Sequence, residues 1–493
     1  MRITIASLLS ICFAVSSFAQ APQSDLKQFI RVDSNVVALT HVRIVDGTGA
    51  APIEDQTILI VDGKITEIHP SKDVKVKEGT KVLDLNGYTV LPGLVGMHDH
   101  MFFPMGGSPP MYSNMGFSFP RLYLALGVTT IRTTGSVQPY LDLEIKKLID
   151  SGRMIGPKMH ITAPYLEGPG SFTPVMHTLK DADDARKMVN YWADQGADSF
   201  KAYMNITRDE LRAAVEEAHK RGLKVTGHLC SIGYKEAAEI GIDNLEHGIF
   251  PDSEFVPNKQ PDKCPGAAVS QSLRTLDINS EPVKETIRTL VAKHVAVTST
   301  LPVFEAGAPL ASAAGTGGGG ASTVSQTAIG ASSAVLNPRM LNVMNNEARV
   351  RYLTARSRIA ADSPSPTLIR KSMDFERAFV AAGGLLIAGL DPTGNGGVVA
   401  GFGDLREVEL LVEAGFTPLE AIKIASLNGA KFLGEDSRIG SIAVGKQADL
   451  MIVKGNPATK ISDIENVEIV FKDGVGYDSE KLIQSVQGLV GIR

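Results

Sequence analysis

Eight short apolar runs, most of them separated by helix-like stretches, constrain the fold of this chain more than any other feature of its sequence. The runs are Leu91–His100, Val128–Ile131, Lys158–Ile161, Ser199–Ala202, Lys224–His228, Asn244–His247, Ala296–Ser299 and Leu385–Ala388. Helical stretches such as Asp209–Arg221 and Glu285–His294 lie between them. This alternation predicts βα units and a parallel sheet. Because eight strands are the number in a closed barrel, we predict an α/β fold with a TIM-like (β/α)8 barrel over residues 91–433.

Both ends of the chain read as short strands that do not belong to the barrel. Strand-like runs flank the turn dipeptides Asp62-Gly63 and Asn86-Gly87, which are strong hairpin signals. Three further strand-like runs follow the barrel at Ile439–Ile442, Ala448–Val453 and Val467–Phe471. We therefore expect a small β-sandwich built from residues 22–90 and 434–493.

The first residues predict a signal peptide over 1–21, which places the mature protein in the periplasm or outside the cell. Arg2 precedes an apolar run too short to span a bilayer, and small residues allow cleavage after Ala19 or Ala21. The formal net charge of −5 comes from interspersed charges. The sequence therefore indicates a small-molecule partner, with no nucleic acid and no membrane span, and leaves a homo-oligomer open.

Two connections are too long for plain turns. The first spans residues 250–281, and the second spans 305–370 and contains a Gly/Ala/Ser tract from Ala311 to Ser322. Both would leave the barrel at one face, either as lids or as flexible insertions. The mature chain keeps two cysteines, Cys230 and Cys264. Their spacing carries no disulfide signal, so free thiols are favoured while a disulfide stays open.

Six polar residues stand at the ends of the apolar runs. A single His-x-His pair at a strand end would be unremarkable, but six such residues rarely coincide by chance. They are His98, His100, Lys201, His228, His247 and Asp391. In a barrel the active site lies at the C-terminal ends of the strands, so these residues would converge in space. Imidazole and carboxylate ligands suit zinc, with manganese or iron as alternatives.

Several motifs together resemble the amidohydrolase superfamily of metal-dependent hydrolases, in its imidazolonepropionase-like and prolidase-like branch. The likeness covers about residues 35–475. The motifs are Leu-Pro-Gly-Leu before His98-Asp-His100, Thr-Gly-His228, Leu-Glu-His247-Gly, Gly-Leu-Asp391-Pro and Gly445-Lys-Gln-Ala-Asp-Leu450.

The resemblance implies a binuclear metal centre. His98, His100 and Asp391 would bind one divalent ion, and His228 and His247 the other. A carboxylated Lys201 would bridge both ions. The implied cofactors are two divalent metals, with zinc expected, and the carbamate of Lys201.

The resemblance also implies the reaction, hydrolysis of an amide or peptide bond by a metal-bridging hydroxide with Asp391 as proton acceptor and donor. An N-acyl amino acid or an Xaa-Pro-type dipeptide is the expected substrate. The alternatives are a cyclic amide or lactone hydrolase, a heterocycle deaminase and a non-catalytic periplasmic binding protein. Deaminating relatives usually carry glutamate where this chain has Ser231, and a binding protein would be expected to have lost one of the six residues.

Four residues are candidates for substrate binding. Arg132, His177 and Tyr203 could hold a substrate carboxylate, and Tyr165 could line an acyl pocket. Thr133 follows Arg132 where relatives more often carry an acidic residue. His160, on the third run, is expected either close behind the metal ligands or in the core.

Overall fold

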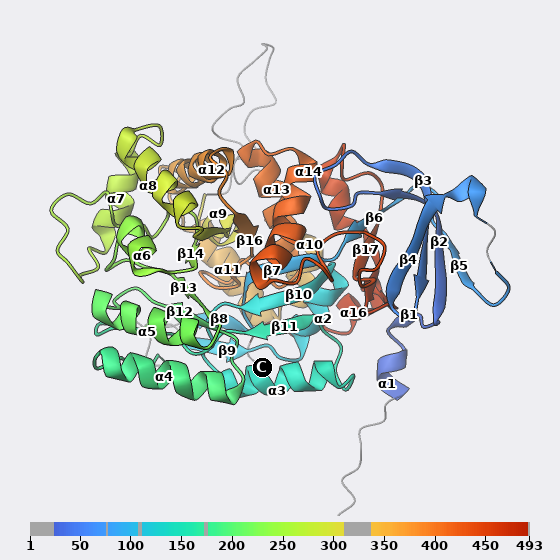
Figure 1. Ribbon diagram of the computed structural model, residues 1–493, viewed down its shortest axis with the longest axis horizontal. Coiled ribbons are helices and arrows are strands. Elements are labelled where there is room, and N and C mark those ends of the chain that lie inside the picture. Colours follow the sequence, from blue (N-terminus) through green and yellow to red (C-terminus); the bar gives the residue numbers. More distant parts are fainter. Residues whose placement is uncertain (1–23, 75–76, 107–110, 172–175, 310–336, 492–493) are drawn as a thin grey trace, which may run out of the picture.

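The eight predicted runs all form strands, and they lie in two parallel sheets. The computed structural model describes residues 24–74, 77–106, 111–171, 176–309 and 337–491 (Figure 1). The three-stranded sheet contains β7 (Leu94–Asp99), β10 (Val128–Thr133) and β11 (Lys158–Ile161), in the order β11-β10-β7. The five-stranded sheet follows chain order and contains β12 (Ser199–Ala202), β13 (Lys224–Gly227), β14 (Asn244–Glu246), β15 (Ala296–Ser299) and β16 (Leu386–Ala388). The mixed α/β prediction is confirmed.

The edges of these two sheets contact each other at both sides. Thr162, just after β11, forms a parallel bridge with Ser199 at the start of β12. On the other side the Asp391 amide, after β16, donates to the His98 carbonyl on β7 at 2.9 Å. Gly389 allows this approach, because a Cβ atom there would stand 2.3 Å from the His98 nitrogen. The backbone at Asp391 is thus fixed directly against β7, the strand that carries His98.

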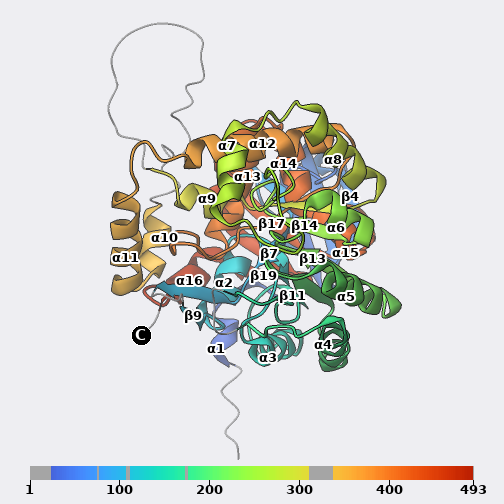
Figure 2. The same cartoon turned by 90° about the vertical axis from the view of Figure 1, so that its left-hand side faces the viewer.

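Helices cover the outside of these strands, as Figures 1 and 2 show. Because nearly every residue of the parallel strands is buried, the strands need a covering layer on their outer face. The longer helices are α3 (Pro139–Asp150), α4 (Ala182–Gln195), α5 (Arg208–Lys220), α8 (Glu281–Ala292), α11 (Asn346–Ser357), α12 (Ser365–Ala381) and α13 (Phe402–Ala414). The shorter ones include α2 (Ser118–Ala125), α6 (Tyr234–Ile240), α9 (Leu301–Ala306), α10 (Pro338–Val343), α14 (Pro418–Lys423), α15 (Gly429–Leu433) and α16 (Ser479–Gln484). Among the described residues, none of these helices is long and apolar enough to cross a membrane.

A nine-stranded sheet joins the two ends of the chain, on the right of Figure 1. Its strands are β1 (Ile30–Val32), β2 (Val36–Ile44), β3 (Ile53–Val61), β4 (Lys64–Pro70), β5 (Lys81–Asp84), β6 (Tyr88–Pro92), β17 (Leu450–Lys454), β18 (Val467–Lys472) and β19 (Val475–Asp478). The pairs β6–β17 and β1–β19 are antiparallel, so the C-terminal strands β17, β18 and β19 lie between β1 and β6 from the start of the chain. An apolar cluster of its own, including Val37, Ile58 and Ile469, packs in this unit.

The predicted strand Ile439–Ile442 is wrong. No strand is assigned there, and Gly440 turns the chain with a φ of +80°. A Cβ atom at Gly440 would lie 2.6 Å from that of Ala430 on α15. The segment is therefore a close turn against α15. The apolar residues of the turn are buried, but they do not pair with another strand.

Residues 250–281 form an excursion that is fastened to the loop after β13. Cys230 and Cys264 form a disulfide, which overturns the preference for free thiols. Lys259 Nζ donates to the Ser231 carbonyl at 2.5 Å, and Arg208 pairs with Asp262 through two nitrogens. The excursion contains one short helix, α7 (Ala267–Thr275). Its path back to β13 could not be read from the spacing of the cysteines. The predicted signal peptide and the tract 311–322 lie outside the described residues.

His160 lies in an ion cluster away from the six strand-end residues. Its Nδ1 is 3.2 Å from Asp198, before β12, and its Nε2 is 3.4 Å from Glu435, after α15. Burial alone would lower the pKa of His160, but the two carboxylates outweigh that effect and raise it to about 9. The imidazolium therefore joins three segments of the chain at neutral pH.

We predict that His160→Asn destabilises the protein in a pH-dependent way. Because the pKa of His160 is higher in the folded protein than the usual 6.5, its stabilisation is complete below about pH 6.5 and is lost as the pH rises through about 9. One pKa unit corresponds to about 1.4 kcal/mol, so the loss at pH 6 should not exceed about 3 kcal/mol. Denaturant unfolding at pH 6, 8 and 10 measures it, with Asp198→Asn expected to show the same trend. A difference from the parent that is equal at all three pH values would contradict this role.

Candidate metal centre and active site

The six strand-end residues meet in one cavity of about 320 Å³. All six line it, together with Phe102, Tyr112, Val137, Tyr165, Met176, Tyr203, Thr393 and Gly394. They meet because parallel strands end at the same edge, so residues far apart in sequence become neighbours. Among the described residues around the cavity, none comes from the 250–281 excursion.

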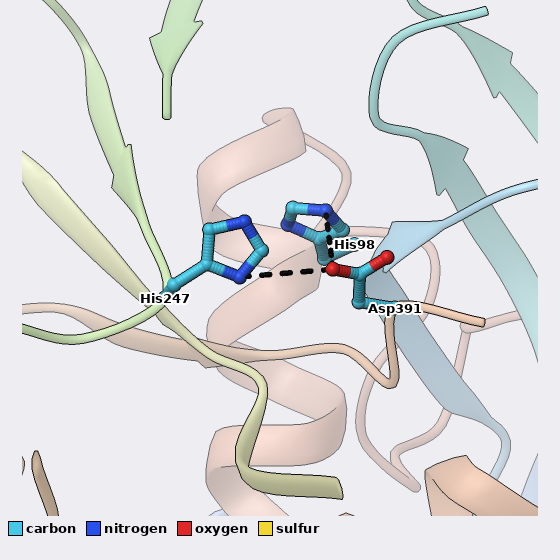
Figure 3. Close-up of side chains that lie close together, drawn as sticks. All are labelled: His98, His247 and Asp391. Carbon is cyan, nitrogen blue, oxygen red and sulfur yellow. Dashed lines mark ion pairs between the residues drawn. The ribbon is translucent and has the colours of Figure 1, made fainter. Parts of the chain in front are cut away.

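The Asp391 carboxylate lies among three imidazoles at the floor of this cavity. Its oxygens are 3.8 Å from His98 Nε2, 3.7 Å from His100 Nε2 and 3.9 Å from His247 Nδ1. Figure 3 shows the carboxylate directed between the rings of His98 and His247. Asp391 has a φ of +51°, uncommon for a residue with a side chain, which turns the chain sharply at this point.

The donor set fits a divalent metal. Burial lowers the pKa of all four histidines, that of His228 to about 3, so the rings are neutral and each offers a lone pair. Asp391 Oδ1 is buried and has no hydrogen-bond partner. Two donors about 2.1 Å from one ion lie within about 4.2 Å of each other, and each of the three imidazole nitrogens lies within 3.9 Å of an Asp391 oxygen. His98, His247 and Asp391 each bring one donor atom to within 4.8 Å of the others.

Lys201 lies beside the same histidines and is 2% exposed. Its Nζ is 3.2 Å from His98 Nε2, and the rings of Tyr165 and Tyr203 lie 5.4 and 5.8 Å from it. Burial lowers its pKa to about 8, although Glu246 and Asp391 oppose this. A lysine in such surroundings carries a neutral amine far more often than an exposed lysine does.

Comparison with known proteins agrees with this chemistry. The Amidohydrolase family matches residues 89–257 and 319–475 of the chain. The chain belongs to the amidohydrolase family.

Individual relatives are more distant from this amidohydrolase. A 5′-deoxyadenosine deaminase of Methanobrevibacter smithii is 41% identical over 59 residues, which are 12% of this chain and 14% of that protein. The chain thus spans only about a seventh of that curated relative. A solved Xaa-Pro dipeptidase with bound methionine has a TM-score of 0.64 and 20% identity, over 90% of this chain and 100% of its own. Bottromycin amidohydrolase has a TM-score of 0.65 and 18% identity, over 95% and 94%. At these identities the two structures show the fold alone.

A layer of buried partners orients the histidines of the amidohydrolase site. His98 Nδ1 is 2.7 Å from Glu246, His100 Nδ1 is 3.0 Å from the Gly135 carbonyl, and His247 Nδ1 is 2.7 Å from the Thr300 hydroxyl. For His98 and His100 these contacts leave Nε2 directed at Asp391. Such partners fix the tautomer and the angle of a metal-binding ring.

Glu246 is a member of this layer that was not recognised as such from the sequence, and the same is true of Gly135 and Thr300. Glu246 is fully buried, and it accepts from Arg132 Nη2 at 2.8 Å and from the Thr226 hydroxyl. Burial alone would raise the pKa of Glu246, but Arg132 and Lys201 outweigh it and hold the pKa below its usual value. Its position directly before His247, in the strand-like run 244–247, was the available signal.

The candidate substrate residues fall into two groups. Tyr165 and Tyr203 line the cavity. Arg132 does not line the cavity, is 1% exposed, and donates to the Met97 carbonyl, Asn244 and Glu246. His177 is 41% exposed, pairs with Asp184 at 3.0 Å, and does not line the cavity. Arg132 therefore supports the site through Glu246 and does not face the space where a substrate would lie.

We predict that Glu246→Gln weakens metal retention about 10- to 100-fold, because the ring of His98 loses its charged partner. The same change leaves the buried Arg132 guanidinium without a counter-ion, which should cost about 3–5 kcal/mol of stability. Chelator competition and denaturant unfolding measure the two effects. Glu239→Gln, on the outer surface of α6, is the matched control. Retention and stability equal to the parent would show that Glu246 does not hold His98.

Proposed function

We propose that this amidohydrolase is a metal-dependent hydrolase that cleaves an amide bond of a small molecule. The observation that carries the proposal is the buried Asp391 carboxylate, with one unpartnered oxygen and three imidazole nitrogens within 3.9 Å of it. Membership of the amidohydrolase family supports hydrolysis as the reaction class. The Xaa-Pro dipeptidase and bottromycin amidohydrolase that share the fold have names consistent with amide chemistry.

We also propose that the two parallel sheets are parts of one (β/α)8 barrel over residues 91–433, with the nine-stranded sheet as a β-sandwich domain made from 22–90 and 434–493. The contacts between Thr162 and Ser199 and between Asp391 and His98 support closure at both seams. The proposal of an exported, periplasmic or secreted protein rests on the sequence of residues 1–21. The Cys230–Cys264 disulfide supports an oxidising compartment.

Two divalent ions, zinc by expectation, would be held by the six residues of the cavity floor. His98, His100 and Asp391 would hold one ion and His228 and His247 the other, with Lys201 between them. His247 lies close to Asp391, so both proposed sets of ligands are near this carboxylate. Bound divalent metals supply an acidified water and polarise a substrate carbonyl.

Carboxylation of Lys201 is the finer part of this proposal. The neutral amine of Lys201 would add to carbon dioxide, forming an N–C bond and releasing a proton to leave an anionic carbamate. Burial and a pKa of about 8 favour the neutral amine that this reaction needs. The carbamate would reverse the charge at a position 3.2 Å from His98, where an ammonium would repel cations.

Asp391 would move the proton in the reaction. Burial raises its pKa to about 6, although Lys201 and Thr393 oppose this, so the carboxylate can accept and return a proton near neutral pH. It would take a proton from the attacking water and pass it to the leaving amine. Cyclic amides and lactones would be hydrolysed by the same steps and stay alternatives. A deaminase would need a proton carrier at Ser231, whose hydroxyl instead donates to the Ile206 carbonyl at 2.5 Å.

The first test of the proposed function concerns Lys201. We expect two metal equivalents per chain after loading with bicarbonate present, and loss of both metal and amide hydrolysis in Lys201→Ala. Lys220→Ala, at the exposed end of α5, should behave as the parent does. Elemental analysis and an amidase assay on the same samples measure this. Two equivalents and parental turnover in Lys201→Ala would remove Lys201 from the site.

The second test separates the chemistry from metal binding. Asp391→Asn should keep its fold and at least one metal, because five other ligands remain. Its kcat should fall about 10² to 10⁴-fold, since an amide side chain cannot accept and return the proton. Kinetics and metal content are compared with those of the parent. If the asparagine variant works within a few-fold of the parent, another group carries the proton.

A further inference from the structure

We propose that the substrate of this site is a neutral amide with an aromatic group beside the scissile bond, rather than an N-acyl amino acid or dipeptide with a free carboxylate. This inference rests on the proposed hydrolase function and names its substrate class. It comes from the walls of the cavity, whereas the proposed function comes from its floor.

Two aromatic pairs form part of the wall. Phe102 and Tyr112 come from the hairpin of β8 (Phe102–Gly106) and β9 (Met111–Asn114), which directly follows His100. Their ring centroids are 5.0 Å apart in an edge-to-face arrangement. Tyr165 and Tyr203 form a second edge-to-face pair at 4.8 Å. These pairs offer ring faces and edges to a planar group of a substrate.

The rest of the wall is uncharged, and the phenols are neutral. Val137, Met176, Thr393 and Gly394 complete the lining. The lining tyrosines are Tyr112, Tyr165 and Tyr203, and a tyrosine hydroxyl ordinarily has a pKa of about 10. All three hydroxyls therefore keep their protons at neutral pH. The walls can pack against hydrocarbon and hydrogen-bond to neutral polar groups.

The positively charged side chains near the site do not form part of the cavity walls. Among the described residues that line the cavity, Lys201 is the sole lysine or arginine, and it lies at the floor beside His98. Arg132 is engaged with Glu246 and His177 with Asp184. Arg351 lies against Gly106 at the far end of the β8–β9 hairpin and does not line the cavity.

The described lining thus offers a substrate carboxylate no arginine or histidine outside the floor. A substrate carboxylate against these walls would therefore lose its water without gaining a counter-ion, which is costly. A cavity of about 320 Å³ is large enough for an aromatic ring and an adjoining amide, since ligand pockets begin at about 300 Å³.

The experiment compares matched amides on the metal-loaded full-length protein. N-benzoylglycinamide, N-benzoylglycine, N-acetylglycinamide and N-benzoylethylenediamine present a neutral aromatic, an anionic, a small neutral and a cationic version of one amide. We expect kcat/KM for N-benzoylglycinamide to exceed each of the others by about tenfold or more. An equal or higher value for the anionic, the small neutral or the cationic amide would overturn the proposal.

A variant tests whether the aromatic wall is the cause. Tyr112→Leu keeps apolar volume but removes the ring, so KM for N-benzoylglycinamide should rise about tenfold with kcat within a few-fold of the parent. The KM for N-acetylglycinamide should stay nearly unchanged. Tyr140→Leu, on the exposed face of α3, is the matched control and should leave both substrates unaffected. Equal effects of Tyr112→Leu on both substrates would contradict aromatic recognition.

Calorimetric binding to the Asp391→Asn protein separates this inference from the proposed function. If the neutral aromatic amide binds more tightly than the other three but the parent hydrolyses none, hydrolysis of amides is wrong and the ligand class stands. If the parent hydrolyses amides but N-benzoylglycine binds as tightly as its amide, the ligand class is wrong and hydrolysis stands. Absence of binding by all four compounds would overturn the ligand class as well.

Discussion

The contact between Glu246 and His98 is the interaction on which the rest of the site depends. The carboxylate has no exposure to water, yet it is ionised because the Arg132 guanidinium donates to it at 2.8 Å. Its oxygens accept from β10 and β13 side chains while one contacts the ring on β7. One buried charge therefore links four strands and sets the angle of the central imidazole.

Desolvation gives the floor of the cavity its chemical character. The same burial that keeps the four imidazoles neutral also lowers the pKa of Lys201 and raises that of Asp391. Neutral imidazole nitrogens and a carboxylate oxygen are groups that can bind a cation. The walls, by contrast, hold no charge of their own among the described residues, so charge is confined to the place where bonds would break.

Much of this site could be predicted from the sequence, because parallel strands bring their C-terminal ends to one edge whatever the details of their packing. His98, His100, Lys201, His228, His247 and Asp391 were found in this way. The role of Arg132 could not be, since its side chain is directed by contacts with Asn244 and Glu246 more than a hundred residues away. The disulfide depends on the path of the 250–281 excursion, and the turn at Gly440 depends on its contact with α15. Such features follow from tertiary packing, which local patterns do not encode.

The interleaving of the two chain ends in the nine-stranded sheet also orders events during synthesis. Strands β2 to β6 leave the ribosome more than three hundred residues before β17 and β18, so β6 waits for its antiparallel partner until nearly the whole chain has emerged. An unpaired strand edge is a template for wrong pairing throughout that interval. Because β6 runs directly into the strand of His98, the segment that begins the candidate site is among the last to gain a fixed support. The final fifty residues thus complete the nine-stranded sheet. A pause late in translation would leave the edge of β6 unpaired for longer.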